Sequence, residues 1–312
     1  MPLSIANGIV AIDMEQEGQF LTSGAYAASS SRFYNPNLAR EVFEENGEYI
    51  EFSAGTKIFS EGVAGDKRGM FSLSKTNYMY FLTEGEVQLS AHGKTMDIFR
   101  PGGVFGEMAV ISQTPGAGAM PRSATATATT DCMAYAMDPA RAEFSLKFAP
   151  DFALMMMSVM FDRLRLLAAR LATRPDSSEH HSKPGEAIFD ESTVQALQAM
   201  LDPSATVRFI EGARIMQEGE MGEHMYIVLD GKVVIAIGRK IVEKLNAGGV
   251  FGEMSLIDRS PRTASAVAKT DCSLLAFDRK ALLRLVESDP SIGMAMMRAV
   301  ASRIRYMNQL LA

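Results

Sequence analysis

One group of residues occurs twice in the chain, and its types and spacing suit a phosphorylated ligand. Residues 248–266 read GGVFGEMSLIDRSPRTASA, and residues 102–126 read GGVFGEMAVISQTPGAGAMPRSATA. Each copy has a glycine pair, then Phe-Gly-Glu, then an arginine. Glycine lets the backbone turn sharply and be approached closely, and a guanidinium can donate two parallel hydrogen bonds to phosphate oxygens. The pattern predicts an anion site in each copy.

The second copy gives three residue types separate tasks. The turn of helix expected after Glu253 would direct unpaired backbone N–H groups, including that of Ser255, at a bound anion. Arg262, nine residues after Glu253 (262 − 253 = 9), supplies the positive charge. A carboxylate next to an anion site fits best as an acceptor for sugar hydroxyls. Gly252, Glu253 and Arg262 together predict a site for a ribose phosphate.

The cassette belongs to a repeat that covers most of the chain. YMYFLTEGEVQLS (78–90) aligns with HMYIVLDGKVVIA (224–236) at an offset of 224 − 78 = 146. The upstream match of Phe52 with Phe209 has an offset of 157, and the downstream match of Arg122 with Arg262 has an offset of 140. The first copy therefore contains two insertions, one of about 11 residues and one of six residues. We place these insertions at about 66–77 and 113–120.

The elements that must position the cassettes are strands and trailing helices. Short apolar runs separated by glycine turns such as TEGEV and LDGKV predict an antiparallel roll. Apolar residues spaced three and four apart predict a helix from Pro150 and another from Pro290. The predicted fold class is mainly β with flanking α (α+β), with two antiparallel β-roll (jelly-roll-like) domains, each followed by amphipathic helices.

This pattern divides the chain into four parts. They are an N-terminal segment (1–45), domain A (46–172), a polar linker with two prolines (173–190) and domain B (191–312). In domain B, Asp190 or Ser192 could cap an entry helix at 191–200. The two cysteines, Cys132 and Cys272, occupy matching places in the repeat and are expected to be buried core thiols.

Composition limits the classes of function. A chain of 312 residues with 47% hydrophobic and 22% charged residues is typical of a soluble globular protein with room for two domains. A net charge of −6 disfavours nucleic acid as a partner. No apolar run approaches the roughly 20 residues of a membrane helix, and the N-terminus does not resemble a signal peptide. We therefore expect a cytoplasmic protein with no membrane or nucleic-acid partner.

The residues that usually carry catalysis are missing from the sequence pattern. Four histidines do not form a metal triad by spacing, and neither a P-loop nor a Ser-His-Asp arrangement is recognisable. We expect no enzyme activity, no catalytic residue, no metal and no cofactor apart from the bound ligand.

The stretch FGEMSLIDRSPRTASA closely resembles the phosphate-binding cassette of cyclic-nucleotide-binding domains, which occur in catabolite activator proteins and in regulatory subunits of cAMP-dependent protein kinase. The resemblance covers roughly 46–172 and 191–312. By family frequency it implies cAMP as the ligand, with cGMP as the other candidate. The ligand-binding residues that it implies in the second copy are Phe251, Gly252, Glu253, Met254, Ser255, Arg262, Thr263 and Ala264. Those in the first copy are Gly106, Glu107, Met108, Ala109, Arg122, Ser123 and Ala124.

The six additional residues in the first cassette leave three interpretations open. The insertion could bulge outward and leave Arg122 in place. It could displace the arginine and make the first site weak or silent. It could also serve as a lid or as a loop that contacts a partner.

The resemblance implies a receptor that acts through other proteins. We expect no helix-turn-helix output domain after the second roll, and the printed sequence contains no Arg-Arg-x-Ser or Arg-Arg-x-Ala pseudosubstrate. We expect ligand binding to move the trailing helices and so to regulate a partner protein or a homo-oligomer. The helix face of Met297, Val300, Ile304 and Met307 could cover the site, contact a partner or pack on its own domain. The alternative is an interaction or scaffold protein in which one or both nucleotide sites are degenerate.

Overall fold

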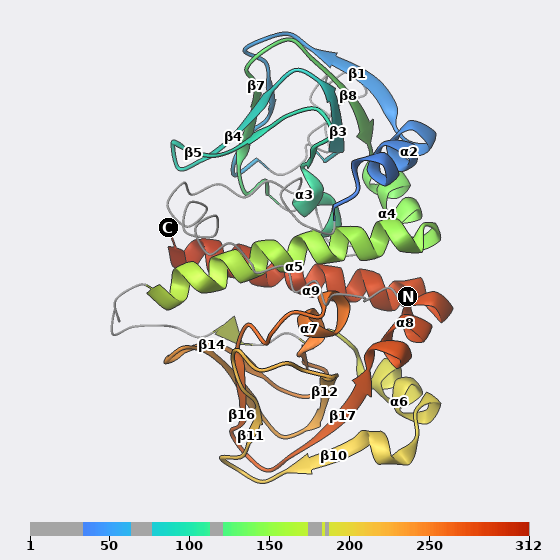
Figure 1. Cartoon of the computed structure of the whole chain (residues 1–312), viewed down its shortest axis with the longest axis vertical. Coiled ribbons are helices and arrows are strands. Elements are labelled where there is room, and N and C mark those ends of the chain that lie inside the picture. Colours follow the sequence, from blue (N-terminus) through green and yellow to red (C-terminus); the bar gives the residue numbers. More distant parts are fainter. Residues whose placement is uncertain (1–33, 64–76, 113–120, 174–182, 185–186, 312) are drawn as a thin grey trace, which may run out of the picture.

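The computed structural model describes residues 34–63, 77–112, 121–173, 183–184 and 187–311. Two β-rolls lie at opposite ends of the long axis, and two long helices lie side by side between them (Figure 1). The predicted insertions at about 66–77 and 113–120 fall almost entirely outside the described residues, as do most of the predicted linker and of the N-terminal segment.

The first roll, called roll A, consists of two antiparallel four-stranded sheets, ordered β1-β8-β3-β6 and β2-β7-β4-β5. Its inward-facing residues form the core in which Tyr80, Phe99 and Phe105 are almost fully buried. The strands are β1 (Glu48–Phe52), β2 (Lys57–Phe59), β3 (Met79–Glu84), β4 (Val87–Ala91), β5 (Lys94–Phe99), β6 (Val104–Phe105), β7 (Thr125–Ala128) and β8 (Cys132–Met137).

The second roll, called roll B, repeats this topology with sheets β10-β17-β12-β15 and β11-β16-β13-β14-β9. Alternate residues of β13 are buried, as expected for a strand with one face on the core. The strands are β10 (Thr206–Phe209), β11 (Arg214–Met216), β12 (His224–Asp230), β13 (Val233–Ile237), β14 (Lys240–Leu245), β15 (Val250–Phe251), β16 (Ser265–Ala268) and β17 (Cys272–Asp278). The additional strand β9 (Lys183–Pro184) pairs in parallel with β14.

The two rolls share irregularities as well as strands. The ladder between β3 and β8 shifts register between Leu82 and Glu84, and that between β12 and β17 shifts between Val228 and Asp230. Both cysteines are buried and unpaired, as the sequence predicts. The predicted fold class is confirmed: the chain contains two β-rolls with flanking helices.

Outside the two cassettes, the helices begin at side-chain caps or prolines. Asp190 accepts a hydrogen bond from the Thr193 N–H (2.7 Å) and caps the predicted entry helix; Asp138 and Asp278 cap equivalent helices after each roll. The helices are α2 (Pro36–Asn46), α3 (Glu107–Ile111), α4 (Pro139–Phe148), α5 (Pro150–Thr173), α6 (Glu191–Met200), α7 (Glu253–Asp258), α8 (Arg279–Ser288) and α9 (Pro290–Leu311), with a 3₁₀ turn at Pro203–Ala205.

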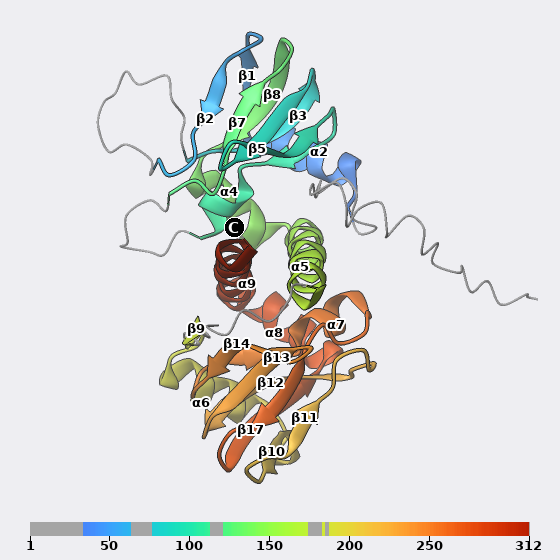
Figure 2. The same cartoon turned by 90° about the vertical axis from the view of Figure 1, so that its left-hand side faces the viewer.

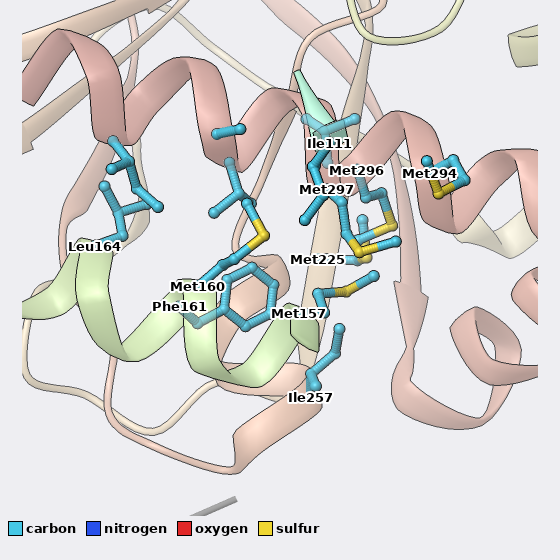
Figure 3. Close-up of a cluster of buried hydrophobic side chains, with 14 of the residues drawn as sticks. Ile111, Met157, Met160, Phe161, Leu164, Met225, Ile257, Met294, Met296 and Met297 are labelled. Atoms are coloured by element: carbon cyan, nitrogen blue, oxygen red, sulfur yellow. The ribbon is translucent and has the colours of Figure 1, made fainter. Parts of the chain in front are cut away.

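The trailing helices α5 and α9 join the two rolls. Both run in the same direction along the middle of the molecule (Figure 1), and Figure 2 shows them nearly end-on between the rolls. Methionines from both helices, including Met157 and Met297, meet in one buried cluster with Met225 of roll B (Figure 3). Lys240 of roll B also donates to the Leu171 carbonyl oxygen at the end of α5 (2.8 Å). Each helix therefore packs against the other repeat as well as its own.

Two features of this arrangement were not predicted. Helix α2 lies almost entirely within the segment predicted as 1–45, ends one residue beyond it and buries Ala39, Val42 and Phe43 in the core. The predicted apolar face of α9 is buried between the repeats rather than against its own roll alone. No helix among the described residues is long and apolar enough to cross a membrane.

Candidate functional site

The second cassette places its arginine beneath a sharp backbone turn, and we call this region site B. Gly252 has φ +82° and precedes α7. The Arg262 guanidinium donates from Nη1 to the Gly252 carbonyl oxygen (2.6 Å) and to Ser255 Oγ (2.7 Å), and from Nη2 to the His224 carbonyl oxygen. These bonds fix the guanidinium against β12 and the start of α7.

Glycines are required on both sides of this guanidinium. A Cβ on Gly252 would lie 2.8 Å from Arg262 Nη1, and its positive φ disfavours other residues. A Cβ on Gly222 would lie 2.1 Å from Arg262 Cζ. The close approach that the glycine pattern predicted is therefore the approach of the arginine itself to the backbone.

The burial of Arg262 favours the binding of an anion next to its guanidinium. Arg262 is only 6% exposed. Burial lowers the pKa of Arg262 from its ordinary value, whereas Tyr226 and Glu253 act in the opposite direction. The side chain stays positively charged at neutral pH because an arginine pKa lies far above 7. A phosphate here would replace the hydration that the guanidinium lost on folding.

The glutamate of site B is held by an arginine from α9. Arg303 donates from Nη1 to Glu253 Oε1 (2.6 Å), from Nε to Glu243 Oε2 (2.9 Å) and from Nη2 to the Val250 carbonyl oxygen. All three ion-paired side chains are largely buried. Burial alone would lower the pKa of Arg303, but the charges of Glu243 and Glu253 outweigh it and raise that pKa above its ordinary value. The ion-pair network links the cassette to the last helix.

A cavity of about 90 Å³ adjoins these groups. Its apolar wall includes Ile235, Val242 and Met307, and two further residues, Leu164 and Ala168, come from α5 of the other repeat. Thr263 Oγ1 is buried beside this wall without a hydrogen-bond partner among the described residues. The site therefore combines a buried cation, a free hydroxyl and an apolar wall, which are suited to a ligand with a phosphate and a flat base.

The first cassette, called site A, repeats the placement of the arginine. Arg122 donates from Nη1 to the Gly106 carbonyl oxygen (2.8 Å) and from Nη2 to the Tyr78 carbonyl oxygen (2.7 Å). These partners match Gly252 and His224 of site B. The longer cassette therefore leaves the arginine in place, which disagrees with the interpretation that the insertion displaces it; the insertion itself, at about 113–120, lies outside the described residues.

The surroundings of Arg122 differ from those of its counterpart. Its guanidinium carbon lies 4.0 Å from the centre of the Phe59 ring, and Ala109 stands where site B has Ser255. Burial lowers the pKa of Arg122 to about 10, Tyr80 and Glu107 oppose this shift, and Arg305 adds to it. Two cavities adjoin this cassette, one of about 30 Å³ beside Arg122 and one of about 60 Å³ beside Asp97, and both are lined by Met108, Ser123 and Ala124.

The acidic groups of site A are less completely paired. Arg163 of α5 donates to Glu107 Oε1 (2.6 Å), as Arg303 does to Glu253. Asp97, which occupies the place of Glu243, accepts from the Ile98 N–H through Oδ1, but its buried Oδ2 has no hydrogen-bond partner among the described residues. Burial raises the pKa of Asp97, and Glu107 adds to this effect, whereas the Ile98 N–H and Arg163 oppose it.

The structure brings the predicted residues together in two groups. All eight predicted residues of the second cassette line the cavity of site B: Phe251, Gly252, Glu253, Met254, Ser255, Arg262, Thr263 and Ala264. All seven of the first line the cavity beside Arg122 in site A: Gly106, Glu107, Met108, Ala109, Arg122, Ser123 and Ala124. Their role as ligand contacts stays a prediction.

Several residues of the sites were missed. Arg163 and Arg303 share the 140-residue offset of the downstream repeat, and Asp97 and Glu243 share the 146-residue offset. An arginine and an acid repeated at these offsets could have been found by comparing the copies position by position. The wall supplied by Leu164 could not, because its contact with site B depends on how the two repeats dock. Among the described residues, no group of three or more side chains is arranged to hold a metal ion.

Two curated proteins are similar to parts of this chain. A CRP-like cAMP-activated global transcriptional regulator of Mycobacterium tuberculosis is 34% identical over 130 residues, which cover 39% of this chain and 56% of the regulator. A cAMP-dependent protein kinase regulatory subunit of Schizosaccharomyces pombe is 26% identical over 242 residues, which cover 75% of this chain and 51% of that subunit. The chain thus spans about half the length of these relatives.

One solved structure and one family model also match parts of the chain. The catabolite activator protein of Thermus thermophilus is 29% identical over 40% of this chain and 62% of its own, with a TM-score of 0.36. The family model of the cyclic nucleotide-binding domain matches residues 49–143 and 206–289. These two matches cover more than half of the sequence, and the chain therefore belongs to the cyclic nucleotide-binding domain family.

Proposed function

We propose that this protein is a cyclic nucleotide sensor that binds cAMP in preference to cGMP and transmits binding to a partner protein through α5 and α9. Site B is the principal ligand site. The protein acts by binding and has no enzyme activity of its own. Membership of the cyclic nucleotide-binding domain family supports the ligand class, and the named activities of the relatives, a cAMP-activated regulator and kinase regulatory subunits, support the regulatory role.

The arrangement around Arg262 carries the proposal. Its guanidinium is buried, yet its hydrogen bonds go to backbone carbonyl oxygens and a hydroxyl, and none goes to a carboxylate. Within the described part of the chain it has no ion pair, so its charge is not neutralised by a contact. The cyclic phosphate would provide that negative charge next to Ser255. Glu253, on the other side of the turn, would accept a hydrogen bond from the ribose 2′-hydroxyl.

The apolar wall suits the purine base. Ile235, Val242 and Met307 offer surface for stacking or packing, and the Thr263 hydroxyl is the polar group without a partner. A hydroxyl at this place can bond either purine. The preference for cAMP is supported by the cAMP in the names of the relatives.

The ion pair between Arg303 and Glu253 would couple binding to the helices. A ribose that bonds Glu253 changes the balance of charge around Arg303, which is part of α9. Since α9 packs along α5, a small movement of α9 alters the surface of both repeats. The ligand can favour one arrangement only as far as it makes better contacts in that arrangement.

Titration calorimetry with cAMP and with cGMP on the full chain tests the proposal. We expect cAMP to bind with the lower Kd, and Arg262→Ala to weaken the tighter binding event at least about thirtyfold, since loss of one partner of a buried charge pair costs roughly 2–5 kcal/mol. Arg208→Ala, in an exposed arginine on β10, is the matched control and should bind as the wild type does. The proposal is wrong if neither nucleotide binds.

Site A favours a second function for domain A. The Phe59 ring lies against the Arg122 guanidinium, and Ala109 offers no hydroxyl at the place where site B has Ser255. Domain A could therefore serve as an interaction module that supports site B. The same titration separates the two functions, because an interaction module gives a single binding event that Arg122→Ala does not change.

A further inference from the structure

An arginine of the second repeat reaches the cassette of the first. Arg305, on α9, donates from Nε to Ser112 Oγ (3.2 Å), from Nη1 to the Pro121 carbonyl oxygen (2.9 Å) and from Nη2 to the Met108 carbonyl oxygen (3.3 Å). All three nitrogens of one guanidinium are thus used on one short region of domain A. Such a fork is a geometry that lysine cannot reproduce.

The three acceptors lie on both sides of the longer segment of this cassette. Met108 and Ser112 precede the residues 113–120, and Pro121 follows them and directly precedes Arg122. The segment from Glu107 to Arg122 is six residues longer than its counterpart in site B. A longer connection holds its ends together less tightly, because closing a loop costs more entropy as the loop grows.

Site B closes the corresponding turn with residues of its own repeat. Arg259 ends α7 with φ +55°, and its N–H bonds the Ser255 carbonyl oxygen (3.0 Å), so that the backbone turns directly toward Arg262. Helix α3 of site A ends at Ser112 in the ordinary right-handed conformation instead. The compact cassette uses a local turn where the longer one has a guanidinium from the other repeat.

The charge of Arg305 also acts on site A. Within the described part of the chain no carboxylate lies within salt-bridge distance of it, and its partners are all neutral oxygens. Burial lowers the pKa of Arg305, and Glu107 opposes that shift. Two guanidinium groups, Arg122 and Arg305, therefore hold positive potential around the same cassette, which favours an anion there.

We propose that Arg305 is a positioning residue for ligand binding at site A, so that the first cyclic nucleotide site is complete only when the last helix of the second repeat is docked on it. The residue holds Pro121, and through it Arg122, at the correct distance from α3. This inference rests on the proposed function, because it concerns how the same class of ligand binds at site A.

The experiment measures each site alone in the full chain, with cAMP as the probe. Arg262→Ala leaves site A, and Arg122→Ala leaves site B. We expect Arg305→Ala to raise the Kd of site A at least about tenfold and to change that of site B by less than about twofold. Gln309→Ala, at an exposed position of the same helix, is the control and should change neither.

Two further measurements separate positioning from charge and from general stability. Arg305→Lys keeps the charge but cannot span three acceptors, so site A should stay weak; full recovery would contradict positioning. Without ligand, Arg305→Ala should speed amide hydrogen exchange in 107–112 and 121–125, while exchange in β12 stays unchanged. A general loss of stability would raise exchange in both places.

The outcomes distinguish this inference from the proposed function. If the wild type binds no cyclic nucleotide, both are wrong. If site B binds but the Arg262→Ala protein does not, the sensor stands and the role of Arg305 is overturned. The role of Arg305 is also overturned if Arg305→Ala binds at site A as the wild type does.

Discussion

Sites A and B are two versions of one cassette, and they differ more in their surroundings than in their arginines. Arg122 and Arg262 donate to carbonyl oxygens at matching places of the two rolls, although their cassettes differ in length by six residues. The roll itself, through β3 and β12, therefore determines where the arginine lies. The length of the cassette does not.

The contrast lies in the groups around that arginine. Site B has a serine at 255, a fully paired network around Arg303 and a cavity of about 90 Å³. Site A has an alanine at 109, a buried Asp97 carboxylate oxygen without a partner among the described residues, and its space is divided between two cavities. The position of the arginine is therefore the same in both sites, whereas the other groups that a ligand could contact differ between them.

The largest expected effect tests the ion-pair networks. Arg303→Ala leaves two buried carboxylates unpaired, and we expect it to destabilise the protein by about 3 kcal/mol, which lowers the Tm by roughly 5–10 °C. Arg163→Ala removes the partner of one carboxylate, Glu107, and should cost less. Thermal unfolding of both variants without ligand measures the difference. A larger loss for Arg163→Ala would contradict the asymmetry between the networks.

A smaller effect tests the serine that site A lacks. Ala109→Ser places a hydroxyl where Ser255 accepts from Arg262, and this hydroxyl can also donate to a phosphate oxygen. We expect cAMP to bind about fivefold more tightly to site A, because one such hydrogen bond is worth about 1 kcal/mol. Ser255→Ala should weaken site B by a similar factor. Titration of the single-site proteins checks both, and unchanged affinities would show that the hydroxyl is not what separates the sites.

The smallest effect tests the carboxylate of Asp97. Burial raises the pKa of Asp97 in the folded protein. As the pH rises, the Asp97 carboxyl group therefore loses its proton at a lower pH in the unfolded chain than in the folded protein. The free energy of unfolding therefore falls as the pH rises from about 4 through the raised pKa of the folded state. Asp97→Asn removes this loss and should stabilise the protein at pH 7 by about 1 kcal/mol, with little gain at pH 4.

Glu243→Gln, at the position of site B that matches Asp97, should change the stability of the protein in the opposite direction. It weakens the ion pair with Arg303, so the Tm at pH 7 should fall rather than rise. Thermal unfolding of both variants at pH 4 and pH 7 measures the pair. Stabilisation by both substitutions would mean that the two acids have the same environment.

Much of this could be predicted from the sequence because the repeat preserves local signals. Glycine turns, strand alternation and the prolines at 150 and 290 depend on neighbouring residues, and they predicted the rolls and both trailing helices. The Gly-Glu and arginine pattern predicted which side chains surround each cavity, since the roll brings together residues that are close along the chain.

The rest depends on contacts between the repeats. Nothing local to Leu164 or Arg305 indicates that each lies against the site of the other repeat, because this follows from the packing of α5 along α9. Helix α2 was missed because its short amphipathic pattern lies beside a polar, small-residue stretch. Only its packing against the core shows its place in the fold.

The most direct test of the account is a cAMP titration of two single-site proteins, Arg122→Ala and Arg262→Ala. Because site B has the serine and the fully paired network around Arg303, we predict that the Arg122→Ala protein binds cAMP with the lower Kd and that the Arg262→Ala protein binds at least about tenfold more weakly. Tight binding that survives in Arg262→Ala and is lost in Arg122→Ala would contradict the assignment of site B as the principal ligand site.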